Sequence, residues 1–516
     1  MARNYEDAIK ALNSLQSNFA VVEAISKSRK GMNRLAIPEM IEWCQRLGYQ
    51  PTDLNKLNII HIAGTKGKGS TSAFISSILS QYLSSNTSSA TTGEVAPSKT
   101  LNKIGLYTSP HLRFVRERIQ INNTPLTEAQ FAKYFFETWD RLEASAKANG
   151  TDPAKKPVYF RFLTLMAFHT YISEGVDAAI IECGIGGEYD STNIIVNPVV
   201  AGITSLGIDH VAVLGETIEE IAWNKAGIMK TGSGAFTVVQ PDAAMGVLRE
   251  RAEEKKVELK CVEGLYKVEK DNVKLGLEGG FQYTNANLAV AVAGEFLRTV
   301  GVDGVPENTP DMALPARFRK GLEDVRLGGR CEIRNEKEVS WHIDGGHTLE
   351  SIKVAGEWFA SQILKSSSST AVANKRPRAL IFNQQARERA GLARSLHETL
   401  TAALHAEKPF THVVFCTNVT YKESGYRPDL VSLKTNSAEV DKLEVQKDLA
   451  DTWKEIDPGT EVQVKGTIEE AVQFVRELAS KENQKSSGAE EAKVMTLVTG
   501  SLHLVGGLLE VLEGGK

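Results

Sequence analysis

The sequence lacks the features that would place it in a membrane or in an oxidising compartment. None of its apolar runs approaches the about 18 residues that a membrane-spanning helix needs, so we expect no membrane span. The N-terminal residues include acids and no apolar segment, unlike a secretory or transit peptide. The five cysteines lie far apart, without the spacing of a disulfide framework or a zinc site. We therefore expect a cytoplasmic protein with reduced thiols, and a mitochondrial form only if an upstream start adds a presequence.

The sequence also lacks an excess of charge of either sign. Lys and Arg number 60 against 64 Asp and Glu, which gives a formal net charge of −4. The basic residues are scattered rather than striped, which argues against a nucleic-acid partner. Nothing in the sequence demands an oligomeric partner, and we expect a monomer.

The 516 residues are too many for one ordinary core. Apolar, β-branched runs alternate with helical patterns almost throughout, as in βαβ units with a mainly parallel sheet. The predicted strands are residues 57–63, 104–107, 178–182, 199–204 and 235–239, then 331–333, 339–343, 379–382, 412–416 and 495–498. Helical patterns occupy residues 127–144, 160–174, 218–229 and 285–300.

A turn-rich stretch, residues 301–310, separates the two series of strands and reads as a boundary with a hinge. We predict an α/β protein with a P-loop ATPase domain at residues 1–305, a linker at 306–325, and a second, smaller Rossmann-like α/β domain at 326–516. The polar segments 84–100 and 480–493 have little to bury and are predicted to be disordered.

The most informative segment is the glycine loop, residues 64–70, which follows a predicted strand and leads into a helix. Glycines allow backbone N–H groups to surround phosphate oxygens, and a lysine such as Lys68 neutralises their charge. The common P-loop pattern has Ser or Thr directly after Gly-Lys, whereas Gly69 here precedes Ser70. The alternative is a flexible turn with exposed lysines. We favour phosphate binding.

Polar residues follow two further strands. Glu182 ends one strand and precedes a glycine-rich turn, and Asp209 and His210 follow the next. Ligands gather at the carboxyl ends of parallel strands, and Mg²⁺ prefers carboxylate oxygens, so Glu182 is a candidate metal ligand. The alternative for Glu182 is an ion pair with a surface lysine. His210 is as well explained by a structural hydrogen bond, and by pattern alone Lys225 is a surface lysine on an amphipathic helix.

The second half repeats this arrangement. Asp344 ends a strand, a Gly-Gly turn follows, and His347 leads into a helix. Asp344 is suited to accept hydrogen bonds from a ribose, and His347 would lie near phosphate. Arg330 follows Gly-Gly and carries a permanent charge suited to a phosphate or a carboxylate. The alternative for each is an ordinary surface turn.

Together these segments resemble the folylpolyglutamate synthase family, a branch of the ATP-dependent Mur ligase superfamily. The resemblance covers most of the chain, and its motifs occur in the family's order. They are residues 64–70, 106–112, 117–122, 182–187, 207–210, 225–228, 344–347 and 499–507. The family's glycine loop also carries Gly between the lysine and the serine, which explains Gly69.

The resemblance implies roles for single residues. The implied phosphate contacts are Gly67, Lys68, Gly69 and Ser70. The implied magnesium ligands are Ser109, Glu182, His210 and Lys225, the lysine as a carbamate. Further ATP contacts are Asn287 on the adenine side, with Arg330, Asp344 and His347 in the second domain. The implied catalytic residues are Lys68, Lys225 and His210.

The implied reaction joins L-glutamate to the γ-carboxyl of a reduced folate. ATP and Mg²⁺ are the expected cofactors, and a monovalent cation such as K⁺ is an option. Dihydrofolate synthase, which adds the first glutamate to dihydropteroate, remains an alternative, and a P-loop regulatory NTPase is another. The sequence departs from the family at residues 383–385, Asn-Gln-Gln, where some relatives carry a Gly-Asp pair. This departure leaves the details of the glutamate site open.

Overall fold

The computed structural model describes residues 3–16, 35–85, 99–262, 268, 272–305, 313–366, 377–385, 388–423, 429, 443–485 and 493–514. Contacts divide the chain into two compact units. Unit 1 comprises Met1–His111, Val115–Gly276 and Gly280–Arg326, and unit 2 comprises Leu112–Phe114, Leu277–Gly279 and Leu327–Lys516.

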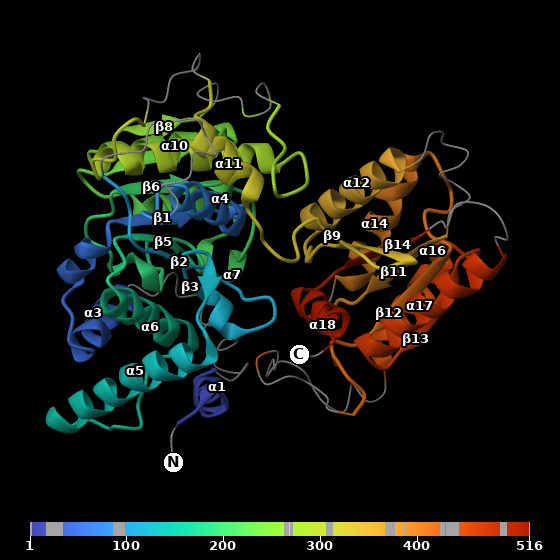
Figure 1. Cartoon of the computed structure of the whole chain (residues 1–516), viewed down its shortest axis with the longest axis horizontal. Coiled ribbons are helices and arrows are strands. Elements are labelled where there is room, and N and C mark those ends of the chain that lie inside the picture. The colour runs from blue at the N-terminus through green and yellow to red at the C-terminus, as the bar shows by residue number, and fades with distance from the viewer. Residues whose placement is uncertain are drawn as a thin grey trace. The chain divides into compact units, whose positions relative to one another are not determined.

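Unit 1 is built on an eight-stranded, mainly parallel sheet in the order β4-β3-β2-β5-β1-β6-β7-β8, in which β3 and β4 are antiparallel (Figure 1). The strands are β1 (Ile59–Ala63), β2 (Ile104–Tyr107), β3 (Ile119–Ile121), β4 (Thr124–Pro125), β5 (Ala178–Glu182), β6 (Val200–Ile203), β7 (Gly234–Thr237) and β8 (Leu259–Cys261). The five strands predicted for this half are therefore present. The short β3, β4 and β8 were not predicted.

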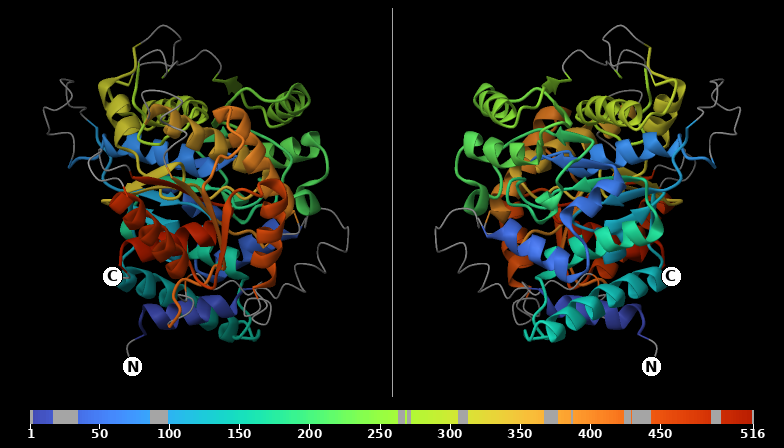
Figure 2. Two further views of the ribbon diagram at one scale, coloured as in Figure 1. Left: turned by 90° about the vertical axis from the view of Figure 1, so that its right-hand side faces the viewer. Right: turned by 90° about the vertical axis from the view of Figure 1, so that its left-hand side faces the viewer.

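Helices cover both faces of this sheet, as a parallel sheet requires. On one face, Ile59 joins a core with α3 (Ala36–Arg46), α5 (Glu128–Ala148) and α6 (Tyr159–Glu174). Ala63, four residues further along β1 and therefore on the same face, joins a core with α8 (Ile218–Lys225) and α9 (Asp242–Glu254). The opposite face is covered by α4 (Lys68–Ser80), which contacts β2 and β5, and by α10 (Gln282–Thr299), which contacts β6 and β7. Helix α1 (Tyr5–Ser14) lies beside α5 (Figures 1 and 2). Unit 1 also contains α7 (Val211–Leu214), α11 (Ala316–Asp324), and the 3-10 helices η1 (Pro51–Leu57), η3 (Val115–Arg118), η4 (Ser191–Ile194) and η5 (Ala226–Ile228).

Unit 2 is built on a six-stranded sheet in the order β13-β12-β11-β14-β10-β9, parallel except for β9. Its strands are β9 (Glu332–Asn335), β10 (Val339–Ile343), β11 (Arg378–Phe382), β12 (His412–Cys416), β13 (Glu461–Lys465) and β14 (Val494–Thr499). Successive residues of β11 point to opposite faces of the sheet and join different cores. Leu380 packs with α12 (Leu349–Lys365), α14 (Arg389–Leu404) and α16 (Glu444–Ile456). Ile381 packs with α17 (Ile468–Lys485) and α18 (Leu502–Leu512). This three-layer arrangement agrees with the predicted fold class.

Two segments differ from their predicted state. Residues 316–324, part of the predicted linker, form α11, which packs against α4 in unit 1, where the Ser77 hydroxyl donates to the Gly321 carbonyl at 2.6 Å. Residues 480–485, predicted to be disordered, continue α17, because they follow directly on a helix whose apolar residues are already held in the core. The rest of that segment, most of segment 84–100, and residues 306–312 lie outside the described residues.

The parallel strands of unit 1 bring the predicted site segments to one edge. β5, β1 and β6 are neighbours, and their registers pair Ile62 with Glu182 and Ala63 with Ile203. β2 pairs with β5 on the far side from β1. The segments after these four strands therefore leave the sheet along the same edge, which is where ligands bind in open α/β sheets.

Candidate functional site

The glycine loop joins the end of β1 to the start of α4. Gly64 and Gly67 both have left-handed backbones, with φ of +149° and +91°. A Cβ at Gly64 would overlap the Thr204 hydroxyl, and one at Gly67 would overlap the side-chain oxygen of Asn285. Both positions thus require glycine. Gly67 is the N-cap of α4 and provides no capping side chain, so the first N–H groups of the helix are suited to an anion.

Two lysines converge on this loop. Lys68 Nζ donates a hydrogen bond to the Gly64 carbonyl at 3.1 Å, and Lys225 Nζ donates to the same oxygen at 2.8 Å. Lys225 is only 3% exposed, so its interpretation as a surface lysine is wrong. Burial, with the nearby charge of Lys68 as the next cause, lowers the pKa of Lys225 to about 7.

The carboxylate of Glu182 lies beside the first turn of α4. The backbone N–H of Ser109 donates to Glu182 Oε2 at 3.1 Å, which brings the segment after β2 to the end of β5. A Cβ placed on Gly69 would have the two carboxylate oxygens as its nearest neighbours, at 3.8 and 3.9 Å. The structure therefore brings Ser109, Glu182 and the glycine loop together, although sequence pattern alone would have left Ser109 in a turn.

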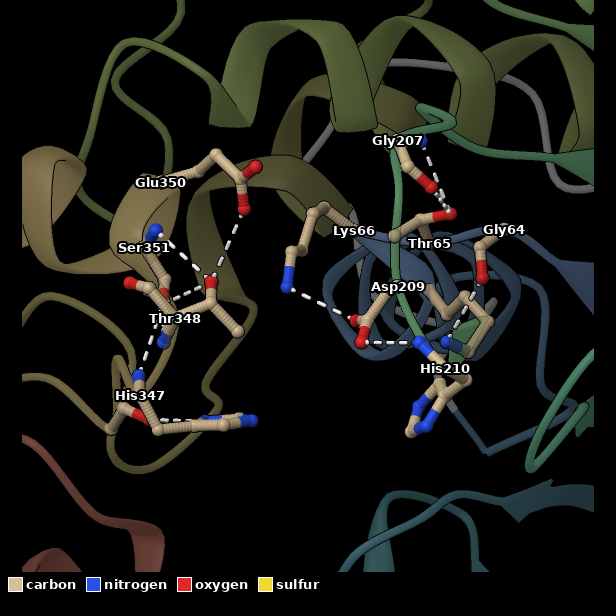
Figure 3. A network of polar contacts seen from close by, with 12 residues as sticks. Gly64, Thr65, Lys66, Gly207, Asp209, His210, His347, Thr348, Glu350 and Ser351 are labelled. Carbon is tan, nitrogen blue, oxygen red and sulfur yellow. Dashed lines mark hydrogen bonds and ion pairs between the residues drawn. The ribbon is translucent and has the colours of Figure 1, made fainter. Parts of the chain in front are cut away.

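The segment after β6 is tied to the glycine loop by several bonds (Figure 3). The Thr65 hydroxyl donates to the Gly207 carbonyl at 3.1 Å, and Lys66 pairs with Asp209 at 3.3 Å. Asp209 Oδ1 accepts the N–H of His210 at 2.8 Å. His210 is exposed and has a left-handed backbone, with φ of +52°. These bonds place His210 on the same edge as Glu182.

Helix α10 contributes amide side chains to the glycine loop. Gln282 Nε2 donates to the Ser70 hydroxyl at 3.3 Å, and Asn285 Nδ2 donates to Gln282 Oε1 at 2.9 Å. The predicted Asn287 accepts a bond from the Val268 N–H at 3.3 Å, and its role on the adenine side stays a prediction. Residues two apart on a helix point to different sides, so Asn285, which the sequence analysis missed, is the asparagine that faces Gly67. Asn285 and Asn287 stand in one triplet, Asn-Ala-Asn, so the sequence alone does not show which of the two faces the glycine loop.

In unit 2, Asp344 directly follows β10 and organises the two turns around it. Asp344 Oδ2 accepts the N–H of Cys331 at 3.0 Å, and Oδ1 accepts the N–H of Gly346 at 2.9 Å. Burial raises the pKa of Asp344, and the charge of Arg330 opposes that rise. Arg330 Nη1 lies 3.3 Å from the Cβ position of Gly345. The predicted Arg330 and Asp344 are therefore neighbours.

His347 begins the segment that leads into α12. Its backbone N–H donates to the Ser351 hydroxyl at 3.0 Å, and its Nδ1 lies 3.2 Å from the Gly345 carbonyl (Figure 3). Thr348 is the N-cap of α12 in a capping box with Ser351. Gln384 Nε2, after β11, donates to the Gly500 carbonyl at 3.0 Å. The unusual Asn-Gln-Gln segment thus braces the ends of neighbouring strands.

The described residues lack two kinds of structure. They contain no cluster of three or more His, Cys, Asp or Glu side chains arranged to hold a metal ion. No helix in the same part of the chain is long and apolar enough to cross a membrane.

The chain is similar to curated proteins along almost its whole length. It is 45% identical over 514 residues to a folylpolyglutamate synthase of Neurospora crassa, covering 99% of this chain and 92% of the relative. It is also 45% identical over 520 residues to the folylpolyglutamate synthase of Saccharomyces cerevisiae, covering 99% of this chain and 88% of the relative. No protein-family model matches the sequence.

Solved structures share the fold at lower identity. A Mycobacterium tuberculosis folylpolyglutamate synthase complexed with ADP superposes with a TM-score of 0.66 at 21% identity, covering 98% of this chain and 99% of that one. A structure described as an FPGS–AMPPCP–folate complex has a TM-score of 0.61 at 21% identity, covering 99% of this chain and 100% of that one. At this identity the likeness establishes the fold alone.

Proposed function

Because this chain belongs to the folylpolyglutamate synthase family, we propose that it is an ATP-dependent ligase that adds L-glutamate to the γ-carboxyl of tetrahydrofolate and its polyglutamates. The observation that carries this proposal is the edge of the unit 1 sheet, where Lys68, Glu182 and the uncapped start of α4 lie together. That combination is suited to a nucleoside triphosphate.

The reaction needs an activated carboxyl, because a carboxylate is a poor electrophile. The folate γ-carboxylate attacks the γ-phosphorus of ATP, forming an acyl phosphate and releasing ADP. The neutral amine of L-glutamate then attacks the acyl carbon, and the tetrahedral intermediate collapses to the amide with loss of inorganic phosphate. In this scheme Lys68 and the N–H groups at the start of α4 orient the phosphates and stabilise their charge.

Magnesium is the metal that these residues suit best. Mg²⁺ takes oxygen ligands, and the site offers the Glu182 carboxylate and the Ser109 hydroxyl on adjoining segments. The absence of a side chain at Gly69 leaves room beside that carboxylate. We assign Ser109, Glu182 and His210 as ligands, although imidazole is a less usual partner for this ion. A bound ion would supply neutralisation of phosphate charge.

Lys225 is the candidate for carbamylation. With a pKa of about 7, much of its amine is neutral near that pH, and a neutral amine adds carbon dioxide to form a carbamate with release of a proton. The product would be a second carboxylate next to the glycine loop. In unit 2 we assign Arg330, Asp344 and His347 to nucleotide recognition.

The other expectations from the sequence stand as proposals. We propose that the enzyme acts in the cytoplasm on small-molecule substrates, as a monomer, and that K⁺ is an optional further cofactor.

One experiment tests the function against both alternatives. The purified protein is incubated with ATP, L-glutamate and either tetrahydrofolate or dihydropteroate, and ADP release and the folate products are measured. We expect ADP release that depends on both glutamate and tetrahydrofolate. Activity with dihydropteroate alone would identify a dihydrofolate synthase, and ATP hydrolysis independent of glutamate would identify a regulatory NTPase.

A further inference from the structure

A chain of buried polar side chains lies beneath the predicted site in unit 1. It comprises His61 on β1, Cys183 directly after β5, Thr192 in η4, and Asp190, the N-cap of η4. His61, Cys183 and Thr192 are fully buried, and Asp190 is 5% exposed. None of the four was among the predicted site residues. Burying so many polar atoms is unfavourable unless they bond to one another, and within the described residues all four side chains do so, although His61 Nδ1 itself has no partner.

The bonds fix which atom carries each hydrogen. Asp190 Oδ1 accepts the backbone N–H and the hydroxyl of Thr192, at 2.9 and 2.7 Å. Since the single hydroxyl hydrogen of Thr192 goes to Asp190, Thr192 Oγ1 acts as the acceptor toward His61. His61 Nε2, 2.8 Å away, must therefore carry a hydrogen and donate it. His61 is then neutral with Nδ1 unprotonated, which agrees with burial lowering its pKa to about 3.

The same chain of bonds holds the turn that follows Glu182. Asp190 Oδ2 accepts the N–H of Ile185 at 2.9 Å, within the glycine-rich turn 184–187. At the other end, His61 stands two residues before Ala63, the last residue of β1 and the base of the glycine loop. These bonds, which we call the buried relay of His61, Thr192 and Asp190, thus connect the strand that supports the glycine loop to the turn that follows Glu182.

The turn also supports the end of α8 that carries Lys225. The Glu188 N–H donates to the Asn224 carbonyl at 2.7 Å. A Cβ at Gly187 would lie 2.9 Å from Lys225 Cα, so turn and helix are in direct contact there. A displacement of the turn would therefore move both Glu182 and Lys225.

We propose that Thr192 is a positioning residue: its hydroxyl, held between His61 and Asp190, fixes the turn that places Glu182 and Lys225 for a divalent cation and its nucleotide. Thr192 is fully buried, so it would act through the turn and not by direct contact with the cation or the nucleotide. The inference rests on the proposed role of Glu182, and it assigns to buried residues of this chain a part in setting affinity at the site.

The test compares variants that differ in the hydroxyl alone. Thr192→Val keeps the shape and removes the hydroxyl, and Thr192→Ser keeps the hydroxyl. Thr170→Val is the matched control, because Thr170 is equally buried and its hydroxyl donates only to the Met166 carbonyl within α6. The affinity for ADP is measured by titration calorimetry with and without Mg²⁺, together with the melting temperature and the KM for glutamate.

We expect Thr192→Val to weaken Mg²⁺-dependent ADP binding about 10-fold or more, the range typical for residues that orient metal ligands, with the KM for glutamate unchanged. Thr192→Ser should stay within about twofold of the wild type. Thr170→Val should lower the melting temperature without changing the affinity. Wild-type affinity in Thr192→Val, or equal impairment in Thr192→Ser, would overturn the proposal.

Two further variants keep the test decisive. If Thr192→Val does not fold, His61→Phe removes the Nε2 donor while keeping a ring, and is expected to weaken Mg²⁺-dependent binding in the same direction. Unchanged binding in that variant counts against the relay. Glu182→Gln separates this inference from the proposed function: if Glu182→Gln leaves Mg²⁺-dependent binding intact, the metal assignment itself fails. If Glu182→Gln abolishes that binding and Thr192→Val does not alter it, only the positioning role fails.

Discussion

The two glycines that flank Lys68 should respond in opposite ways to the addition of a methyl group. Gly67 has φ of +91°, and a left-handed backbone costs a residue other than glycine about 1–2 kcal/mol. A Cβ there also overlaps Asn285 Oδ1 and lies 3.0 Å from Asn285 Cγ, so the amide must move and lose its bond to Gln282. That bond contributes about 1 kcal/mol. Gly67→Ala should therefore lower the free energy of unfolding by about 2–3 kcal/mol.

Gly69 lies inside the first turn of α4, and a Cβ there meets nothing closer than 3.8 Å. Because alanine favours a helix over glycine by about 1 kcal/mol, Gly69→Ala should leave stability unchanged or raise it by up to about that amount. Its methyl group lies beside Glu182, in the space that we assign to the phosphates and the metal. The affinity for ADP with Mg²⁺ should consequently fall in this variant without any loss of stability.

Urea denaturation and calorimetric titration with ADP and Mg²⁺ measure the two effects separately. Gly232→Ala is the control, since Gly232 has φ of +84° with no atom within 4 Å of its Cβ position. It should show the backbone penalty of about 1–2 kcal/mol alone. A Gly67→Ala protein as stable as the wild type, or a Gly69→Ala protein destabilised as much as Gly67→Ala, would refute the reasoning.

Three further outcomes follow from the same contacts. Lys68→Ala should abolish ATP-dependent glutamate addition while circular dichroism shows an intact fold, and wild-type turnover in this variant would contradict the assignment of the glycine loop. Ser109→Ala should raise the Mg²⁺ concentration needed for half-maximal activity more than Ser70→Ala does, and the reverse order would restore the ordinary P-loop arrangement. Burial lowers the pKa of His342 to about 4 from 6.5, so the unfolded chain takes up a proton at pH values where the folded one does not. The free energy of unfolding should thus fall by about 3 kcal/mol from this group as the pH drops from 6.5 to 4, and pH-dependent urea denaturation should show a smaller fall in His342→Gln.

The strands were the most predictable part of the fold, because a strand buried on both faces leaves a continuous apolar run in the sequence. Strands β2, β5, β10 and β12 have the predicted bounds. Strand β13 escaped prediction because it is an edge strand whose residues are exposed or half-buried, so it lacks a continuous apolar run. The alternation of polar and apolar side chains in Glu461–Lys465 is itself typical of a half-buried strand and was the signal that could have found it.

A site residue could be predicted only where its neighbours in the sequence indicate its place in the fold. The position of Glu182 could be predicted, because a carboxylate at the end of a buried parallel strand lies at the edge of the sheet where ligands bind. The burial of Lys225 depends on how α8 meets the turn 184–187, which no local pattern records. His61 and Thr192 are distant in sequence and meet only in the folded unit, so nothing near either residue indicated their bond.

The two units are not continuous in sequence, which matters for expressing either of them separately. Leu112–Phe114 belong to unit 2, although unit 1 precedes and follows them in sequence. There Leu112 packs against the core beside Gly328, and Arg113 forms an ion pair with Glu510 at 2.6 Å. A fragment that starts at Leu327 would omit this three-residue segment, leaving an apolar surface uncovered and Glu510 without Arg113. Unit 2 therefore cannot be cut out or exchanged at one junction, because a chimaera must also take Leu112–Phe114 and Leu277–Gly279.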